Sequence, residues 1–147
     1  MLTSSITTPA KQVRPRIVTI AGVLTAINTF RLIAILFILA AIAGTVPATS
    51  FIPGIGDFLT GLTAPFIVFA LFRRKGVNTW ATALVWHTVA LVDVVVALAL
   101  SFLASNSVLS PSLVLLLPFT FLTAHIISLV LLTRRTTKEY YIGSPNK

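Results

Sequence analysis

The sequence predicts an all-α integral membrane bundle of four transmembrane helices. The chain has 147 residues, of which 56% are hydrophobic and 10% are charged, whereas a soluble domain carries roughly 25% charged residues. A soluble domain is excluded because so short a chain could not bury that much apolar surface. Disorder is excluded because disordered segments have low hydrophobicity. The chain also contains no cysteine, which excludes disulfide frameworks, zinc–thiolate sites and iron–sulfur clusters.

Four apolar stretches each have about the 20 residues that a helix needs to cross a bilayer. These predicted spans cover residues 17–43, 55–72, 79–103 and 111–133. Residues 1–16 and 134–147, which precede and follow this transmembrane domain in the chain, are expected to be cytoplasmic tails. The segments between the spans contain the Gly, Pro, Ser and Asn residues that favour turns. Strands of a membrane barrel would be shorter and would alternate apolar with polar residues.

The basic residues predict the orientation of the bundle. With four spans, every Lys and Arg except Arg31 falls on one side of the membrane, and the two opposite loops, 44–54 and 104–110, carry no charge. The positive-inside rule therefore predicts that both termini are cytoplasmic. Basic clusters beside apolar spans are explained by orientation and by anionic headgroups. No nucleic-acid-binding motif accompanies them, so nucleic acid is not an expected partner.

Three charged side chains fall within the spans, at one depth. At 1.5 Å per residue, Arg31, Asp57 and Asp93 each lie about 21–22 Å from the predicted cytoplasmic end of their helix. Ionisable groups inside a membrane normally face the bundle interior and have partners. Asn28 shares the helix face of Arg31, and Thr60 shares that of Asp57. The sequence thus predicts a buried polar site made of these five residues.

Two interpretations of this site remain open. In the structural one, Arg31 neutralises one aspartate and fixes the helix register, while the other aspartate is hydrogen-bonded or protonated. In the functional one, the carboxylate in excess of Arg31 binds a proton or a small cation, and the two carboxyl groups titrate as a coupled pair. A further explanation concerns Asp57 alone: in the first turn of its helix, the helix dipole would favour an anion.

The two histidines form a second predicted level. His87 and His125 each lie about 12 Å from the cytoplasmic side, on consecutive antiparallel spans, so their rings could face each other. Ligation of a b-type haem or a metal between two helices requires such a pair. However, there are only two histidines and no Glu-x-x-His motif, and lone intramembrane histidines mostly hydrogen-bond a neighbouring helix. Haem or metal binding is therefore the alternative hypothesis.

Three segments carry a resemblance to other proteins. They are residues 51–65 (FIPGIGDFLTGLTAP), residues 86–93, and residues 109–113 with the run that leads on to His125. Together they resemble a group of small, uncharacterised bacterial inner-membrane proteins with four spans. The resemblance implies a bacterial plasma-membrane location and a role for Asp57 and Asp93. The group often has Asn in the place of His87, which weakens the bis-histidine hypothesis.

The functional prediction follows from these sites. No nucleophile with a placed base is visible, so an enzyme is not expected and no catalytic residue is assigned. We expect a small proton- or solute-coupled carrier, or an accessory subunit of a membrane complex, built around the Arg/Asp site. Because four short helices rarely enclose a transport path alone, we expect a homo-oligomer or a larger assembly. The alternative is an electron-transfer subunit that binds haem through His87 and His125.

Overall fold

A computed structural model describes residues 13–46, 48, 51–103 and 111–143, with the backbone alone described for 101–103 and 111–115. Throughout these residues the regular structure is helical, which confirms the all-α prediction. The elements in chain order are α1 (Arg16–Ile27), η1 (Asn28–Ile33), α2 (Ala34–Ile42), α3 (Phe51–Arg73), α4 (Val77–Leu103), α5 (Pro111–Thr133) and α6 (Arg135–Ile142). The predicted loop at 104–110 and most of the predicted N-terminal tail lie outside the described residues.

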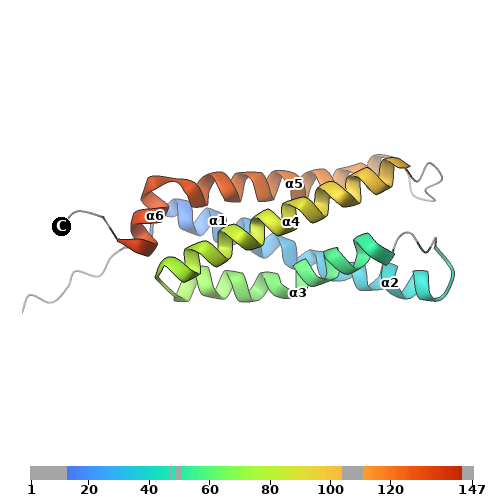
Figure 1. Ribbon diagram of the computed structural model, residues 1–147, viewed down its shortest axis with the longest axis horizontal. Helices are drawn as coiled ribbons and strands as arrows, with labels where there is room; N and C mark the ends of the chain where they lie inside the picture. The colour runs from blue at the N-terminus through green and yellow to red at the C-terminus, as the bar shows by residue number, and fades with distance from the viewer. Residues whose placement is uncertain (1–12, 47, 49–50, 104–110, 144–147) are drawn as a thin grey trace, which may run out of the picture.

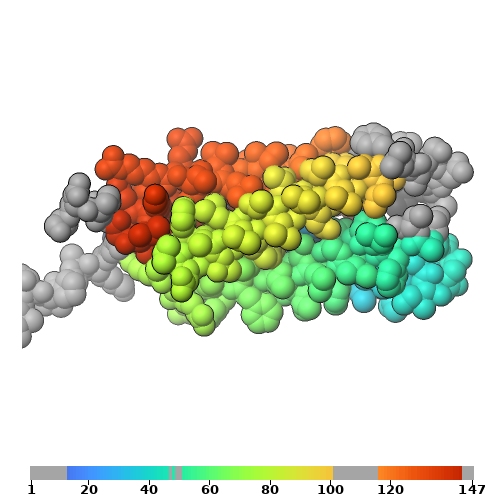
Figure 2. All heavy atoms as spheres, viewed as in Figure 1, coloured from blue at the N-terminus to red at the C-terminus, as the bar shows by residue number. Residues whose placement is uncertain are grey.

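Over the described residues, four helical rods are long and apolar enough to cross a membrane. The first rod is α1, η1 and α2 taken together, and the other three are α3, α4 and α5. Successive rods run in opposite directions along the long axis of the molecule (Figure 1). The rod α1–η1–α2 contacts α3 and α5, and α4 contacts the same two helices from the other side. Figure 2 shows α4 crossing one face of the bundle between α3 and α5. The chain is thus a multi-pass membrane protein.

The distribution of side chains also suits a membrane. Large apolar side chains such as Phe30, Phe66 and Val85 point outward, and Phe30 is 76% exposed. The interior positions are often small, as at Ala21 and Ala64, which are fully buried. Small residues at interfaces let transmembrane helices approach closely, because lipid provides no hydrophobic force between them.

Two helices differ from their predicted form. Helix α3 begins at Phe51 rather than at residue 55, because Pro53 in a first turn needs no backbone hydrogen bond and does not stop a helix. No acidic residue lies in that first turn, so the helix-dipole explanation of Asp57 does not apply. The first rod, predicted as one α-helix, changes to a 3₁₀-helix at η1, which contains Arg31. A 3₁₀ stretch within a helix often marks a functional or strained position.

The segment expected to be a C-terminal tail contains a folded helix, α6, at the end of the bundle where the basic residues gather. The hydroxyl of Tyr141 donates a hydrogen bond to the carbonyl of Leu71 in α3 at 2.7 Å. The backbone N–H of Gly76 donates to the carbonyl of Tyr141 at 3.0 Å. Tyr140 and Tyr141 are buried in one apolar cluster with residues of α1, α3, α4 and α5. Helix α6 therefore closes the basic end of the bundle.

Candidate functional site

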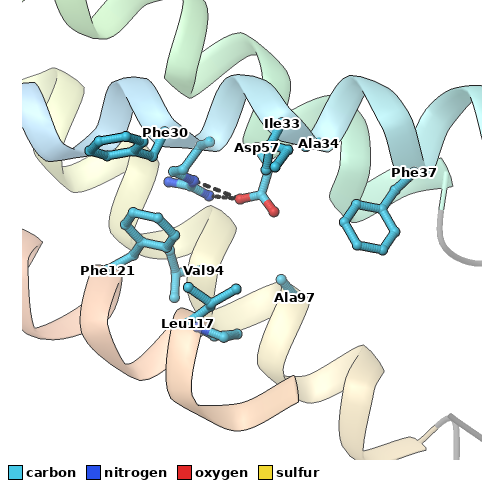
Figure 3. Close-up of a pocket in the computed structure, with 11 residues that line it drawn as sticks. Phe30, Ile33, Ala34, Phe37, Asp57, Val94, Ala97, Leu117 and Phe121 are labelled. Carbon is cyan, nitrogen blue, oxygen red and sulfur yellow. Dashed lines mark hydrogen bonds and ion pairs between the residues drawn. The ribbon is translucent and has the colours of Figure 1, made fainter. Parts of the chain in front are cut away.

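The central feature of the bundle is an ion-pair triad, Arg31–Asp57–Asp93. The guanidinium of Arg31 donates from Nε to Asp57 Oδ1 at 2.6 Å and also from Nη2 to the same oxygen. Its Nη2 donates to Asp93 Oδ2 at 2.5 Å. The Arg31 side chain is 1% exposed, against 35% for Asp57 and 21% for Asp93. One buried cation therefore joins two carboxyl groups from two other helices (Figure 3 shows the Arg31–Asp57 pair).

Two glycines of α3 make this approach possible. A Cβ atom at Gly61 would lie 2.5 Å from the backbone nitrogen of Leu32 and 2.9 Å from the carbonyl carbon of Arg31. A Cβ atom at Gly56 would overlap Oδ1 of Asp93. Because glycine carries no Cβ, α3 can press against both η1 and the Asp93 carboxylate. The glycine positions thus set the separation at which the three charges meet.

The two histidines continue the polar network from the triad toward the basic end. Arg31 Nη1 lies 3.4 Å from His125 Nε2. The Nδ1 atoms of His125 and His87 are 2.9 Å apart. His87 Nε2 lies 3.1 Å from the hydroxyl of Thr25, which donates to the carbonyl of Ala21 at 2.7 Å. The two histidines are fully buried.

The proton positions along this network follow from the donors at its ends. Arginine only donates hydrogen bonds, so Nε2 of His125 accepts from Arg31. A neutral ring that accepts at one nitrogen carries its proton on the other, so His125 Nδ1 donates to His87 Nδ1. His87 then carries its proton on Nε2 and donates it to Thr25, whose own proton goes to a carbonyl. Each contact in this network has one donor and one acceptor, with both imidazoles neutral.

The two levels predicted from the sequence are thus in direct contact. Side chains on a helix lean toward its N-terminus. Arg31 therefore leans toward the basic end, where its rod begins, while His125 leans the other way because α5 runs in the opposite direction. The length of the arginine side chain spans the remaining distance. Counting residues along each helix could not show this contact.

The imidazole pair does not have the geometry that the haem hypothesis requires. The ring centroids of His87 and His125 are 5.2 Å apart and the two Nδ1 atoms are at hydrogen-bond distance, so no porphyrin ring fits between them. The ring of Trp86 packs against both imidazoles, with centroid separations of 4.9 and 5.6 Å. Among the described residues, no three His, Asp or Glu side chains are grouped so that they could hold a metal ion.

Two of the predicted site residues lie near the network but are not joined to it by a described hydrogen bond. The side chain of Asn28 is fully buried and its Nδ2 donates to the carbonyl of Leu24 at 3.1 Å, while its Oδ1 has no partner among the described residues. Thr60 is buried on α3 beside Gly61. Sequence reasoning did not assign Thr25, although it lies three residues before Asn28 on one helix face.

A cavity of about 470 Å³ opens beside the triad, between η1 and α2 on one side and α4 and α5 on the other (Figure 3). Helix α2 packs against α3, and within the described residues the cavity lies between α2 and α5. Arg31 and Asp57 are the charged residues of the lining. The remaining walls are apolar: Phe30, Ile33, Ala34, Phe37, Val94, Ala97, Leu117, Pro118 and Phe121. We refer to this cavity as the Asp57 pocket.

Comparison with known proteins defines the family. No curated protein and no solved structure matches the chain. One family model matches residues 1–134, which is most of the chain. The chain therefore belongs to the family described as "Domain of unknown function (DUF8737)".

Proposed function

We propose that this protein is a small proton-coupled carrier whose Arg31–Asp57–Asp93 triad takes up and releases a proton. The observation that carries the proposal is the charge of the triad: two carboxyl groups share one guanidinium, and the neighbouring imidazoles are neutral. An unmatched carboxylate in apolar surroundings is costly. A proton bound by the aspartate pair removes that excess charge.

The proton is assigned to the pair rather than to one residue, because two carboxyl groups bound to the same cation titrate together. Replacing either aspartate by asparagine leaves one carboxylate opposite Arg31, which is a balanced pair. Both Asp57→Asn and Asp93→Asn should therefore abolish proton binding while the helices still fold and insert. A purely structural ion pair would instead lose stability on either substitution, and its carboxyl groups would not change protonation between acidic and alkaline buffer.

The test is infrared difference spectroscopy of the full chain in lipid vesicles, stepped between acidic and alkaline buffer. The chain is well suited because its acidic side chains are Asp57, Asp93 and Glu139 alone. Glu139 lies on α6, where it accepts a hydrogen bond from Arg135 at 2.6 Å, so Glu139→Gln is the matched control. We expect a titrating aspartate band in the wild type and in Glu139→Gln, in addition to the C-terminal carboxyl that every variant shares. This aspartate band should disappear when either aspartate substitution is added to the Glu139→Gln background. A band that persists in both aspartate variants contradicts the proposal.

The proposal includes the orientation expected from the basic residues, in a bacterial inner membrane with both termini cytoplasmic. The chain has no cysteine, so labelling of one introduced cysteine shows on which side of the membrane that residue lies. We expect Ala43→Cys, at the end of α2, to react with a membrane-impermeant maleimide on intact bacterial cells. Thr136→Cys, exposed on α6, should react only after the membrane is opened. The reverse labelling pattern would show that the termini face the outside of the cell and would contradict the proposed orientation.

We further propose that the carrier works as a homo-oligomer, because four short helices rarely enclose a transport path alone. Light scattering of the detergent-purified protein measures the number of chains per particle. A monomer would contradict this part of the proposal. Copurification with one fixed foreign protein in mild detergent would favour the accessory-subunit hypothesis instead.

A further inference from the structure

We propose that the Asp57 pocket binds a hydrophobic organic cation, which enters in exchange for the proton held by the Asp57–Asp93 pair. The inference rests on the proposed proton-binding function and names the ligand class that such a site would take. Its basis is the position of the pocket: the cavity of about 470 Å³ ends at the triad. That volume lies within the range of about 300–1,000 Å³ usual for sites that bind small molecules.

The charges at the base of the pocket favour a cation over an anion. Arg31 has five N–H groups, and four are committed: Nε and Nη2 serve the two aspartates and Nη1 serves His125. An anion would therefore find at most one uncommitted N–H on Arg31 and would lie beside two carboxyl groups. Asp57, by contrast, uses only Oδ1 for the guanidinium, and its other oxygen is directed away from Arg31 (Figure 3). The acceptor available to a ligand is a carboxylate oxygen.

The walls favour a cation with an apolar body. Three phenylalanines, Phe30, Phe37 and Phe121, line the pocket. Aromatic rings attract cations through their negative faces, and the guanidinium of Arg31 already lies 5.4 Å from the Phe121 ring centroid. A small hydrated metal ion would leave these walls without a partner, whereas an organic cation would cover them. The apolar lining therefore selects against simple ions.

The rim of the pocket indicates entry from the bilayer. Phe30, Phe37 and Leu117 all line the pocket and are 76%, 45% and 56% exposed. In a transmembrane bundle such side chains face lipid, so the pocket opens sideways between α2 and α5. A hydrophobic cation concentrates in the membrane and would reach Asp57 from there. As the cation enters, the pair releases its proton, and the net charge of the site is unchanged.

The decisive probes are tetraphenylphosphonium and tetraphenylborate, which have the same shape and opposite charge. Binding of each to the detergent-purified full chain is measured by equilibrium dialysis across a pH series. We expect tetraphenylphosphonium to bind, and to bind more weakly in acid, where protons compete for the pair. Tetraphenylborate should not bind. Equal binding of the two probes would mean an apolar cavity that lipid acyl chains fill, and stronger binding of the borate would mean an anion site at Arg31; either result overturns the proposal.

Two substitutions separate the charge from the shape of the pocket. Asp57→Asn should weaken tetraphenylphosphonium binding by about tenfold or more, because the cation loses its counter-charge in an apolar site. Leu117→Trp should reduce binding by filling the cavity while leaving the triad intact. The matched control is Leu116→Trp, since Leu116 faces a different cavity with Leu24 and Ile27; it should bind as the wild type does. Equal losses in the two tryptophan variants would contradict binding in the Asp57 pocket.

The infrared titration described above keeps the two proposals distinguishable. A titrating carboxyl band without phosphonium binding would overturn the ligand class and leave the proton site standing. Phosphonium binding that does not vary with pH, together with no titrating band, would overturn the proton exchange and the proposed function. Wild-type binding with an unaffected Asp57→Asn variant would overturn the ligand site alone.

Discussion

His87 and His125 are joined through their Nδ1 atoms, 2.9 Å apart, and the contact requires the two rings to be different tautomers. His125 donates because its other nitrogen accepts from Arg31, and His87 accepts because its other nitrogen donates to Thr25. Because Arg31 can only donate hydrogen bonds, it determines the tautomer of His125 and, through His125, that of His87. The pair also gives Arg31 a third hydrogen-bond partner besides the two carboxyl groups.

The tautomers are directly measurable. In ¹⁵N-histidine-labelled protein in bilayers, solid-state NMR should show one neutral ring protonated at Nδ1 and one protonated at Nε2. Replacing Arg31 by Gln, whose amide can also accept a hydrogen bond, should release this constraint and mix the two forms at His125. Two rings of the same tautomer, or a doubly protonated ring at neutral pH, would be inconsistent with the network.

Removing the cation of the triad should be more damaging than removing the whole triad. Arg31→Met leaves two carboxylates facing each other in the bundle and should cost about 3–5 kcal/mol of unfolding free energy. The triple variant Arg31→Met/Asp57→Asn/Asp93→Asn removes all three charges and should recover much of that loss. Unfolding in mixed detergent measures both. Equal stability of the single and triple variants would show that charge pairing does not dominate at this site.

The glycines of α3 should respond to alanine in a graded way. Gly61→Ala places a methyl group against the backbone of η1, which cannot move aside, and should cost about 1–3 kcal/mol. At Gly54 the nearest atom lies farther away and belongs to a side chain, Ile38 Cγ1 at 3.1 Å, so Gly54→Ala is the matched control with a smaller loss. Thermal unfolding in detergent gives the order. A loss at Gly54 that equals the loss at Gly61 would mean that the close approach at η1 is not limiting.

The contact of α6 with the bundle should depend on one hydroxyl group. Tyr141→Phe removes the hydrogen bond to Leu71, which should lower stability by about 1 kcal/mol. Tyr140→Phe is the control, because the ring it alters packs against Tyr141 at 5.0 Å between centroids and its hydroxyl is not part of that bond. Equal losses in the two variants would show that the Leu71 bond adds nothing to stability.

The same tyrosine predicts a pH dependence. Burial, and after it the neighbouring Tyr140, raises the pKa of the Tyr141 hydroxyl, although Arg14 opposes the shift. The unfolded chain therefore ionises this group at a lower pH than the folded protein does. Stability from this group is fully present below the unfolded pKa and is lost as the pH rises above about 10. Unfolding at a series of alkaline pH values should show a smaller decline in Tyr141→Phe than in the wild type.

The four rods and their approximate limits were predictable from the sequence, because the length of an apolar run and the 1.5 Å rise of a helix are local properties. The exceptions have local causes as well. Helix α3 extends back to Phe51 because Pro53 is compatible with a first turn. Helix α6 was not predicted because it is short and polar, so it does not stand out by its hydropathy. Depth along a helix was also accessible, and equal depth is why Arg31, Asp57 and Asp93 were grouped.

The contacts themselves were not accessible from the residue order. Equal depth does not say which way a helix is rotated or how closely two helices approach, and both depend on packing at positions such as Gly56 and Gly61. The link between Arg31 and His125 arises because antiparallel helices tilt their side chains toward opposite ends. Among the described residues, the Asp57 pocket lies where α2 packs against α3, on the side that faces α5. Hydropathy and helical rise thus determine the spans and the depth of each charge, while the close packing of helices decides which charges meet and where a ligand can enter.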